Sequence, residues 1–437
     1  MTMLFSTKSN LSIDRSRFWS ITILLFFLFA YMLTARGKIQ NSDEMTMYAS
    51  LMNLVEKHTL AIDELNTLNQ SIDLRIGFYG ADGHLYSKYS PGNILFGGIL
   101  YWVGSRIHPL LGNLFVLYLN AFLGAIGMLL LFKMLMRYFS VKTSIAVVML
   151  IGLCSDWWYQ SRGFGLETGG GVLLLASLML ADRSQLTGSA ASFGMSLYFR
   201  TLNILALPVW LLGWWRTKRF DVKSVGILAI TGVGLLGYNW VRFGSVTNFG
   251  YDNVSFTTPL FVGLSGLLFS PGCSIFVYSP VLFFSFLGIW KWLKFDKSVG
   301  IVLITTIILY ILSVATWVSC DSGWSWGSRL LTPVIPLMGL AFAPLVDLAW
   351  SKWGWMLLII VAGLWGFGIE LLALVSDPLI TLKEAVMIRG ISYDSTIYSW
   401  QNSWIILQYQ SLSKWSLNDL DALILRSLLK LFMYGGK

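Results

Sequence analysis

Apolar residues occur in long stretches along this chain, and polar residues gather in short clusters between them. The first stretch covers about 18–34, and similar stretches recur up to about residue 376. A run of about 20 apolar residues is long enough to cross a bilayer as a helix. These runs lack the period of two that strands of a membrane barrel show. The pattern therefore predicts an all-α polytopic membrane protein.

The clusters of Lys and Arg predict how the chain threads through the membrane, because cytoplasmic loops carry an excess of both. A basic cluster within the first 17 residues places the N-terminus inside, so that 36–92 become a long first outer loop. The basic cluster at 133–142 should again be cytoplasmic. This requires the short apolar segment 93–104 to dip into the outer leaflet without crossing.

The remaining clusters continue the alternation. The further stretches predicted to be cytoplasmic are 182–185, 216–223, 291–297 and 351–354. The threading gives about 11 transmembrane helices. It assigns residues 1–376 to a transmembrane domain and 377–437 to an outer tail with amphipathic helices.

Composition narrows the possible functions. Of the 437 residues, 56% are hydrophobic and 12% are charged, with a net charge of +9. In a membrane protein this excess belongs to cytoplasmic loops and lipid headgroups, so membrane lipids are expected as partners and nucleic acid is not. The cysteines are Cys154, Cys273 and Cys320, and the histidines are His58, His84 and His108. Their spacing predicts neither a disulfide framework nor a zinc site. No cofactor is predicted, and a divalent metal is left open.

Two adjacent carboxylates open the first outer loop. "NSDEMTMYASLMNLVEKHTL" has apolar residues at helical spacing over 44–57, which predicts an amphipathic helix lying on the membrane. Asp43 and Glu44 stand at its start. One interpretation is a helix cap in which Asn41 or its neighbours bind the first amides and Glu44 favours the dipole. The other is a pair of catalytic carboxylates, and the residues alone leave both open.

A short hairpin is predicted further along the same loop. In "RIGFYGADGHLYSKYSPGNILFGG" the "ADG" turn separates two aromatic-rich runs. The second run carries Tyr86, Lys88 and Tyr89 just before Pro91. The ammonium of Lys88 either snorkels to the headgroup level or binds a lipid phosphate as a point charge.

Other charged and aromatic side chains fall on the predicted outer side. Arg162 and Glu167 lie in "YQSRGFGLETGGG", and Arg200 lies in "LYFRTLN" between two apolar helices. "TWVSCDSGWSWGSRLLTPVIP" adds Asp321, Trp326 and Arg329. These residues form either ion pairs within an aromatic belt or a site that faces a sugar ring or a headgroup. The arginines are suited to phosphate oxygens.

The order of these motifs resembles the bacterial GT-C glycosyltransferases, which include protein mannosyltransferases and aminoarabinose transferases of lipid A. "DE" and Tyr after the first helix, "YSKYSPG", "YQSRGFGLE", "LYFRTLN", "YNWVRFGSVTNFGY", "GLLFSPG" and "GWSWGSRLLTPVIP" cover most of the chain up to about residue 336. The resemblance implies a helical bundle with a site at the outer leaflet. It implies an inverting sugar transfer from a polyprenyl-phosphate donor to a lipid, glycan or protein acceptor.

The resemblance also implies roles for single residues. Asp43 would be the general base, with Glu44 as the second choice, and burial beside aromatic residues is expected to raise the pKa of the base. Lys88 would bind the donor phosphate, assisted by Arg329 and by Arg162 or Arg200. Tyr86, Tyr89, Glu167, Asp321 and Trp326 are the expected substrate-binding residues. The chain departs from the family where two residues separate Lys88 from Pro91 and where Ser328 replaces a proline.

The expected location is the cytoplasmic membrane of a bacterium, with the site facing outward. A transporter or flippase for lipid-linked saccharides is an alternative, but it predicts internal repeats and broken helices at the midplane. A polymerase or ligase of surface polysaccharides is another, which would carry its arginines in one large late loop. Here the charged residues are scattered along the chain and share one predicted side of the membrane.

Overall fold

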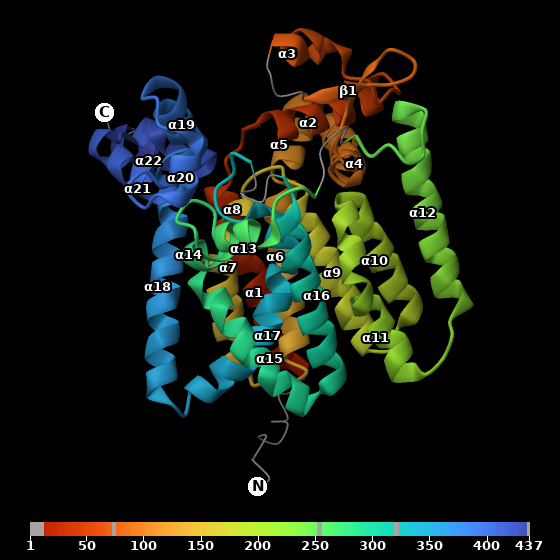
Figure 1. Ribbon diagram of the computed structural model, residues 1–437, viewed down its shortest axis with the longest axis vertical. Coiled ribbons are helices and arrows are strands. Elements are labelled where there is room, and N and C mark those ends of the chain that lie inside the picture. The colour runs from red at the N-terminus through yellow and green to blue at the C-terminus, as the bar shows by residue number, and fades with distance from the viewer. Residues whose placement is uncertain (1–12, 72–75, 251–255, 319–322, 435–437) are drawn as a thin grey trace.

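Helices make up nearly all of the fold (Figure 1). The computed structural model describes residues 13–71, 76–250, 256–318 and 323–434. In these ranges the only strands are β1 (Gly77–Tyr79) and β2 (Leu85–Ser87), which pair antiparallel. The all-α class and the hairpin are both confirmed.

A helical bundle forms the body of the molecule. Its inner helices are α6 (Leu119–Leu135), α9 (Glu167–Asp182) and α17 (Ile335–Ala349). Around them lie α1 (Ile13–Thr34), α7 (Val141–Leu153), α10 (Leu186–Phe199), α11 (Leu207–Thr217), α12 (Val222–Phe243), α13 (Leu260–Phe269), α15 (Phe284–Phe295), α16 (Lys297–Thr316) and α18 (Trp353–Val375). Short helical turns link them: α8 (Asp156–Gln160), η2 (Thr201–Ala206), α14 (Ile275–Tyr278), η3 (Pro280–Phe283) and η4 (Arg329–Val334).

Burial separates inner helices from those that face lipid. The segment Arg329–Ala349 is apolar nearly all round, and 89% of its most apolar window is buried, compared with 17% for α12. On α12, Ile230, Val233 and Val241 are exposed. In a bilayer such a face is solvated by lipid tails, so the exposed apolar residues are not a liability there.

Some of the predicted spans are single long apolar helices. Within the described residues, five segments are long and apolar enough to cross a membrane: Ser16–Thr34, Val222–Phe243, Lys297–Thr316, Arg329–Ala349 and Trp353–Val375. The pair α5 (Pro109–Leu117) and α6, bent by 44°, would be a sixth. Helices such as α7 and α11, with 13 and 11 residues, are shorter than a bilayer requires. The count of about 11 stays a prediction.

One end of the bundle is held by a cluster of ion pairs. Asp182, at the end of α9, is 2.8 Å from Arg137 and 2.9 Å from Arg216. Arg216 is also 2.5 Å from Asp296, which caps α16. Four stretches predicted to be cytoplasmic therefore meet at one end of the molecule.

The first outer loop folds at the opposite end. It contains α2 (Ser42–Glu56), η1 (Asp63–Leu65), α3 (Asn66–Ser71) and the β hairpin, followed by α4 (Gly92–Ile107). The predicted helix over 44–57 is confirmed as α2. Figure 1 shows α4 beside α2 at this end, and α4 packs closely on α5 because Gly104 faces Gly112. A Cβ on Gly104 would lie 2.8 Å from the Cα of Gly112.

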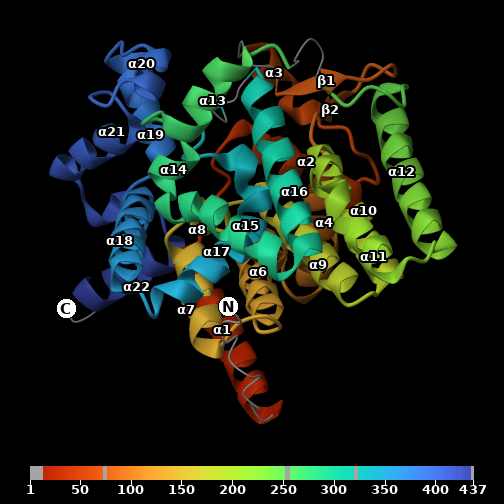
Figure 2. The ribbon, with the colours of Figure 1, turned by 60° about the horizontal axis from the view of Figure 1, so that its bottom comes forward.

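The tail after α18 is also helical and lies at this same end in Figure 1, and Figure 2 shows it gathered around the end of α18. It comprises α19 (Pro378–Lys383), a π-helical turn η5 (Glu384–Ile388), α20 (Tyr393–Tyr398), α21 (Trp404–Ser411), η6 (Leu412–Lys414), η7 (Leu417–Asp419) and α22 (Leu423–Tyr434). The helices predicted in this tail are therefore present.

Candidate active site

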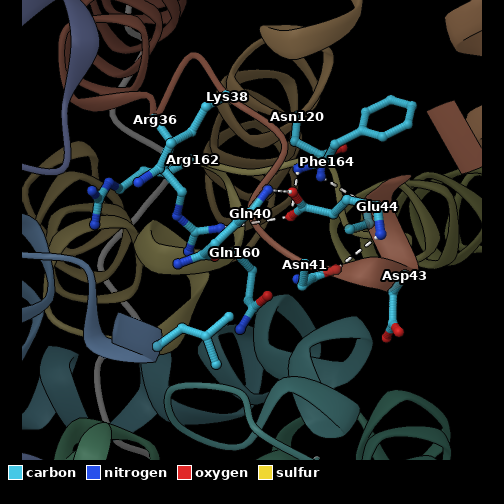
Figure 3. A network of polar contacts seen from close by, with 12 residues as sticks. Arg36, Lys38, Gln40, Asn41, Asp43, Glu44, Asn120, Gln160, Arg162 and Phe164 are labelled. Carbon is cyan, nitrogen blue, oxygen red and sulfur yellow. Dashed lines mark hydrogen bonds and ion pairs between the residues drawn. The ribbon is translucent and has the colours of Figure 1, made fainter. Parts of the chain in front are cut away.

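The start of α2 sends two adjacent carboxylates in different directions. The side-chain oxygen of Asn41 accepts a hydrogen bond from the amide of Glu44 at 2.9 Å, which is N-cap geometry. Consecutive side chains leave a helix about 100° apart. Figure 3 shows Glu44 directed into a polar network, whereas Asp43 points away from it. The cap and the carboxylate pair are thus parts of one arrangement.

Glu44 is an anchor within the protein. Its side chain is buried and accepts hydrogen bonds from the amides of Gln40 at 2.9 Å and Phe164 at 3.1 Å. Arg36 lies 3.7 Å from the same carboxylate. Burial raises the pKa of Glu44 despite these partners. Protein groups thus contact both oxygens of Glu44, whereas Asp43 lies outside this network.

Asp43 begins a row of alternating charges. Its Oδ2 is 3.1 Å from Nη1 of Arg329, and Nε of Arg329 is 3.6 Å from Glu167. Glu167 is in turn 3.1 Å from Nη1 of Arg200. The four residues come from α2, η4, α9 and the residue that ends α10, so residues far apart in sequence meet here. Side chains of Asp43 and Arg329 remain 23% and 20% exposed, which leaves this part of the row accessible.

Lys88 approaches Asp43 from the end of the hairpin. Its ammonium lies 5.4 Å from the ring centre of Tyr89 and interacts electrostatically with Asp43. The backbone on either side is held by Arg242, which donates to the carbonyls of Ser87 at 2.5 Å and Tyr89 at 3.3 Å. Among the described residues, no ion-pair partner lies beside the Lys88 ammonium. The lysine is a positioned cation with capacity for an anion.

The site has a net positive character. Lys88, Arg329 and Arg200 face Asp43 and Glu167, so three cations outnumber two carboxylates among the described side chains. Burial pushes the pKa of Asp43 upward, but Arg329 and Lys88 outweigh it and the net pKa is lowered. The expectation of a raised pKa for the base was therefore wrong, although burial acts in that direction. Burial and Arg329 together lower the pKa of Lys88, although Asp43 opposes them.

Several other residues predicted for the site lie elsewhere. Arg162 is buried in a second network, where it donates to the carbonyl of Thr34 at 2.7 Å and pairs with Asp421 at 3.3 Å. Tyr86 donates to Asp82 at 2.6 Å and packs on Phe243. Trp326 is buried, with its ring near those of Tyr159 and Tyr278. Asp321 lies outside the described residues. Tyr89, in contrast, hydrogen-bonds to Asp43 within the site.

Sequence reasoning missed a buried carboxylate next to this row. Asp156 starts α8 and accepts hydrogen bonds from Gln160 and Thr332, each at 3.3 Å. Burial raises its pKa to about 7. Its only signal in the sequence is an acidic residue between an apolar run and two tryptophans. Among the described residues, no three His, Cys, Asp or Glu side chains are grouped as a metal ion would require.

The helical fold of this chain is shared with two solved structures of ArnT at low sequence identity. The chain is similar to ArnT from Cupriavidus metallidurans bound to undecaprenyl phosphate, with 13% identity, a TM-score of 0.53, and coverage of 92% of this chain and 79% of that one. It is also similar to ArnT from the same organism in the apo state, with 15% identity, a TM-score of 0.54, and coverage of 90% of this chain and 76% of that one. No family model and no curated protein sequence matches the chain.

Proposed function

We propose that this protein is an inverting glycosyltransferase. It would move a sugar from a polyprenyl-phosphate donor to a lipid, glycan or protein acceptor at the outer face of a bacterial cytoplasmic membrane. The observation that carries the proposal is the shared position of Asp43 and Lys88 around Arg329. A base and two cations that suit a phosphate thus lie together. The fold it shares with ArnT, one structure of which holds undecaprenyl phosphate, supports a lipid phosphate as the leaving group.

In this proposal Lys88 and Arg329 bind the donor phosphate. Lys88 has no competing ion pair among the described residues, and Arg329 can present two donors of its fork to phosphate oxygens. Glu167 keeps Arg329 in place from its other side, at 3.6 Å. The two cations stabilise the negative charge that develops on the phosphate as the sugar leaves.

The transfer step uses Asp43 as the general base. A hydroxyl of the acceptor attacks the anomeric carbon, and its proton passes to a carboxylate oxygen of Asp43. The bond between the anomeric carbon and the phosphate oxygen breaks, and its electron pair stays on polyprenyl phosphate. Attack on the opposite face from the leaving phosphate inverts the anomeric centre.

Donor binding is also expected to change the pKa of Asp43. Before binding, Arg329 and Lys88 hold the pKa of Asp43 below its usual value, which makes it a weak proton acceptor. A phosphate anion between the two cations offsets their field at Asp43 and competes for the guanidinium of Arg329. The pKa of Asp43 then rises, so the carboxylate becomes a better base once the donor is bound.

The test is Asp43→Asn in purified full-length protein, assayed for sugar transfer from polyprenyl-phosphate donors in lipid nanodiscs. General-base catalysis contributes on the order of 100- to 10,000-fold, so kcat should fall within that range. The control is Asp394→Asn, an exposed carboxylate in the tail. Wild-type transfer by Asp43→Asn would refute the role of the base.

A further inference from the structure

The C-terminal tail forms ion pairs and hydrogen bonds with residues 35–40, the segment that connects α1 to α2. In the tail, Asp421 lies 3.4 Å from Arg36 and 3.2 Å from Lys38. Asp377 lies 2.9 Å from Lys38 and accepts a hydrogen bond from the side-chain amide of Gln40 at 2.5 Å. Two tail carboxylates therefore bind three side chains of one short connecting segment.

The backbone of residues 35–40 packs closely against the tail at Gly37. Gly37 adopts φ +64°, and a Cβ there would lie 2.5 Å from the Cδ2 of Leu423. A glycine permits both the left-handed backbone and the close approach. The amide of Leu423 donates to the carbonyl of Ala35 at 3.1 Å, and that of Asp421 donates to Leu374 at 3.0 Å. The main chain on either side of the tail carboxylate is thus fixed by the residue that follows α1 and by α18.

A path of buried charges runs from this contact to the start of α2. The guanidinium of Arg36 lies between Asp421, at 3.4 Å, and Glu44, at 3.7 Å. All three residues are at most 5% exposed. Figure 3 shows Gln40 next to Glu44, with Arg36 and Lys38 in the same view of this network. Because Glu44 follows Asp43 in α2, the path ends next to the proposed base.

We propose that the C-terminal tail is a positioning part of the catalytic site. Asp421 acts through Arg36 and Glu44 to hold the start of α2, so that Asp43 faces Arg329. Residues 35–40 form no helix or strand, and their contacts with the tail and with Glu44 restrain them. A buried cation that loses one of its partners is destabilised, so removal of the Asp421 charge leaves Arg36 and Arg162 each short of a carboxylate and lets Arg36 shift together with Glu44, its remaining partner. The kinetic part of this inference rests on the proposed function, and the conformational part does not.

The experiment uses Asp421→Asn in the full chain, which removes one charge and preserves side-chain volume. Misplacement of a catalytic group by about 1 Å costs up to about 100-fold, so kcat should fall by at least about tenfold. The KM for the donor should stay within about twofold, because Lys88 belongs to the hairpin and not to this network. Asp421→Glu, which keeps the charge, should recover most of kcat. The matched control is Asp419→Asn, an exposed residue whose carboxylate binds only Ser416 in the tail.

Amide hydrogen exchange provides a readout that needs no enzymatic assay. Peptides that cover 36–45 should exchange faster by about tenfold or more in Asp421→Asn, while those of the hairpin keep the wild-type rate. If the wild-type protein transfers no sugar, the proposed function fails, and exchange still decides whether the tail positions α2. If Asp421→Asn does not purify in a folded state, Lys38→Gln takes its place, because the Lys38 side chain is 46% exposed.

Two results would overturn the inference. The first is unchanged exchange over 36–45 in a folded Asp421→Asn protein. The second is a fall in kcat accompanied by an equal loss of donor affinity, which would indicate a general structural defect.

Discussion

Replacing Lys88 by Met should weaken the binding of polyprenyl phosphate more than it slows transfer at saturating donor. Methionine keeps much of the length of the side chain and removes only the charge and its hydrogen-bond donors. Arg242 holds the backbone on both sides of Lys88, at Ser87 and Tyr89, so the hairpin keeps its shape in the variant. The change therefore isolates the contribution of one ammonium group.

The size of the effect follows from the surroundings of Lys88. A hydrogen bond between charged groups contributes about 1.5–3 kcal/mol. Lys88 has no ion pair to break among the described residues, so the phosphate gains this full interaction. Since each 1.4 kcal/mol is about tenfold in Kd, we expect a loss of about 10- to 150-fold. Arg329→Gln should cost less affinity, because the phosphate must displace Asp43 from a 3.1 Å ion pair to reach the guanidinium.

The assay is the Kd for polyprenyl phosphate in nanodiscs between about pH 7.5 and 10, where the phosphate is fully ionised. The ammonium is the binding form, and the lowered pKa of Lys88 means that it is lost below the usual lysine range as pH rises. Wild-type affinity should therefore fall toward the alkaline limit, and the affinity of Lys88→Met should be flat. Lys57→Met, at an exposed lysine after α2, is the control. A variant that keeps either wild-type affinity or the alkaline fall would refute the reasoning.

Two further substitutions test the division of roles in the outer network. Glu44→Gln should cost less than about 1.5 kcal/mol in thermal unfolding, because burial already raises the pKa of Glu44 and a neutral amide oxygen still accepts from Gln40 or Phe164. Glu44→Ala should cost about 3–5 kcal/mol, since it also leaves the amides of Gln40 and Phe164 without an acceptor, and equal melting of the two variants would contradict this. Arg162→Met should likewise destabilise the protein by about 3–5 kcal/mol through loss of the contact with Asp421, and the remaining folded fraction should keep donor affinity. If Arg162→Met instead lowered donor affinity without loss of stability, Arg162 would have to be a phosphate-binding residue.

The elements of the outer end were predictable because each has a local signal. Apolar residues at helical spacing over 44–57 predicted α2, and "ADG" between aromatic runs predicted the β hairpin. The number of spans has no comparably clear signal, because helices such as α7 and α11 are shorter than a bilayer requires.

For the site, the sequence predicted the participants better than their partners. Asp43, Glu167, Arg200 and Arg329 were each singled out, but their alternating order arises only from the packing of α2, α9 and η4. Arg162 pairs with Asp421, which is 259 residues away in sequence. Asp421 lies in no recognisable motif, so this partner could not be predicted. The pKa of Asp43 was predicted with the wrong sign because burial was visible in the pattern of apolar neighbours and the distances to two cations were not.

The two ends of the bundle are held by ion pairs of different burial. Arg137, Asp182, Arg216 and Asp296 tie together the ends of helices that come from four separate stretches of the chain, and both arginines are partly exposed. At the opposite end, the pairs of Asp421 with Arg36 and Arg162 are buried. A helix movement that opened the end near Asp43 would therefore have to separate buried charges, which costs more than separating exposed ones.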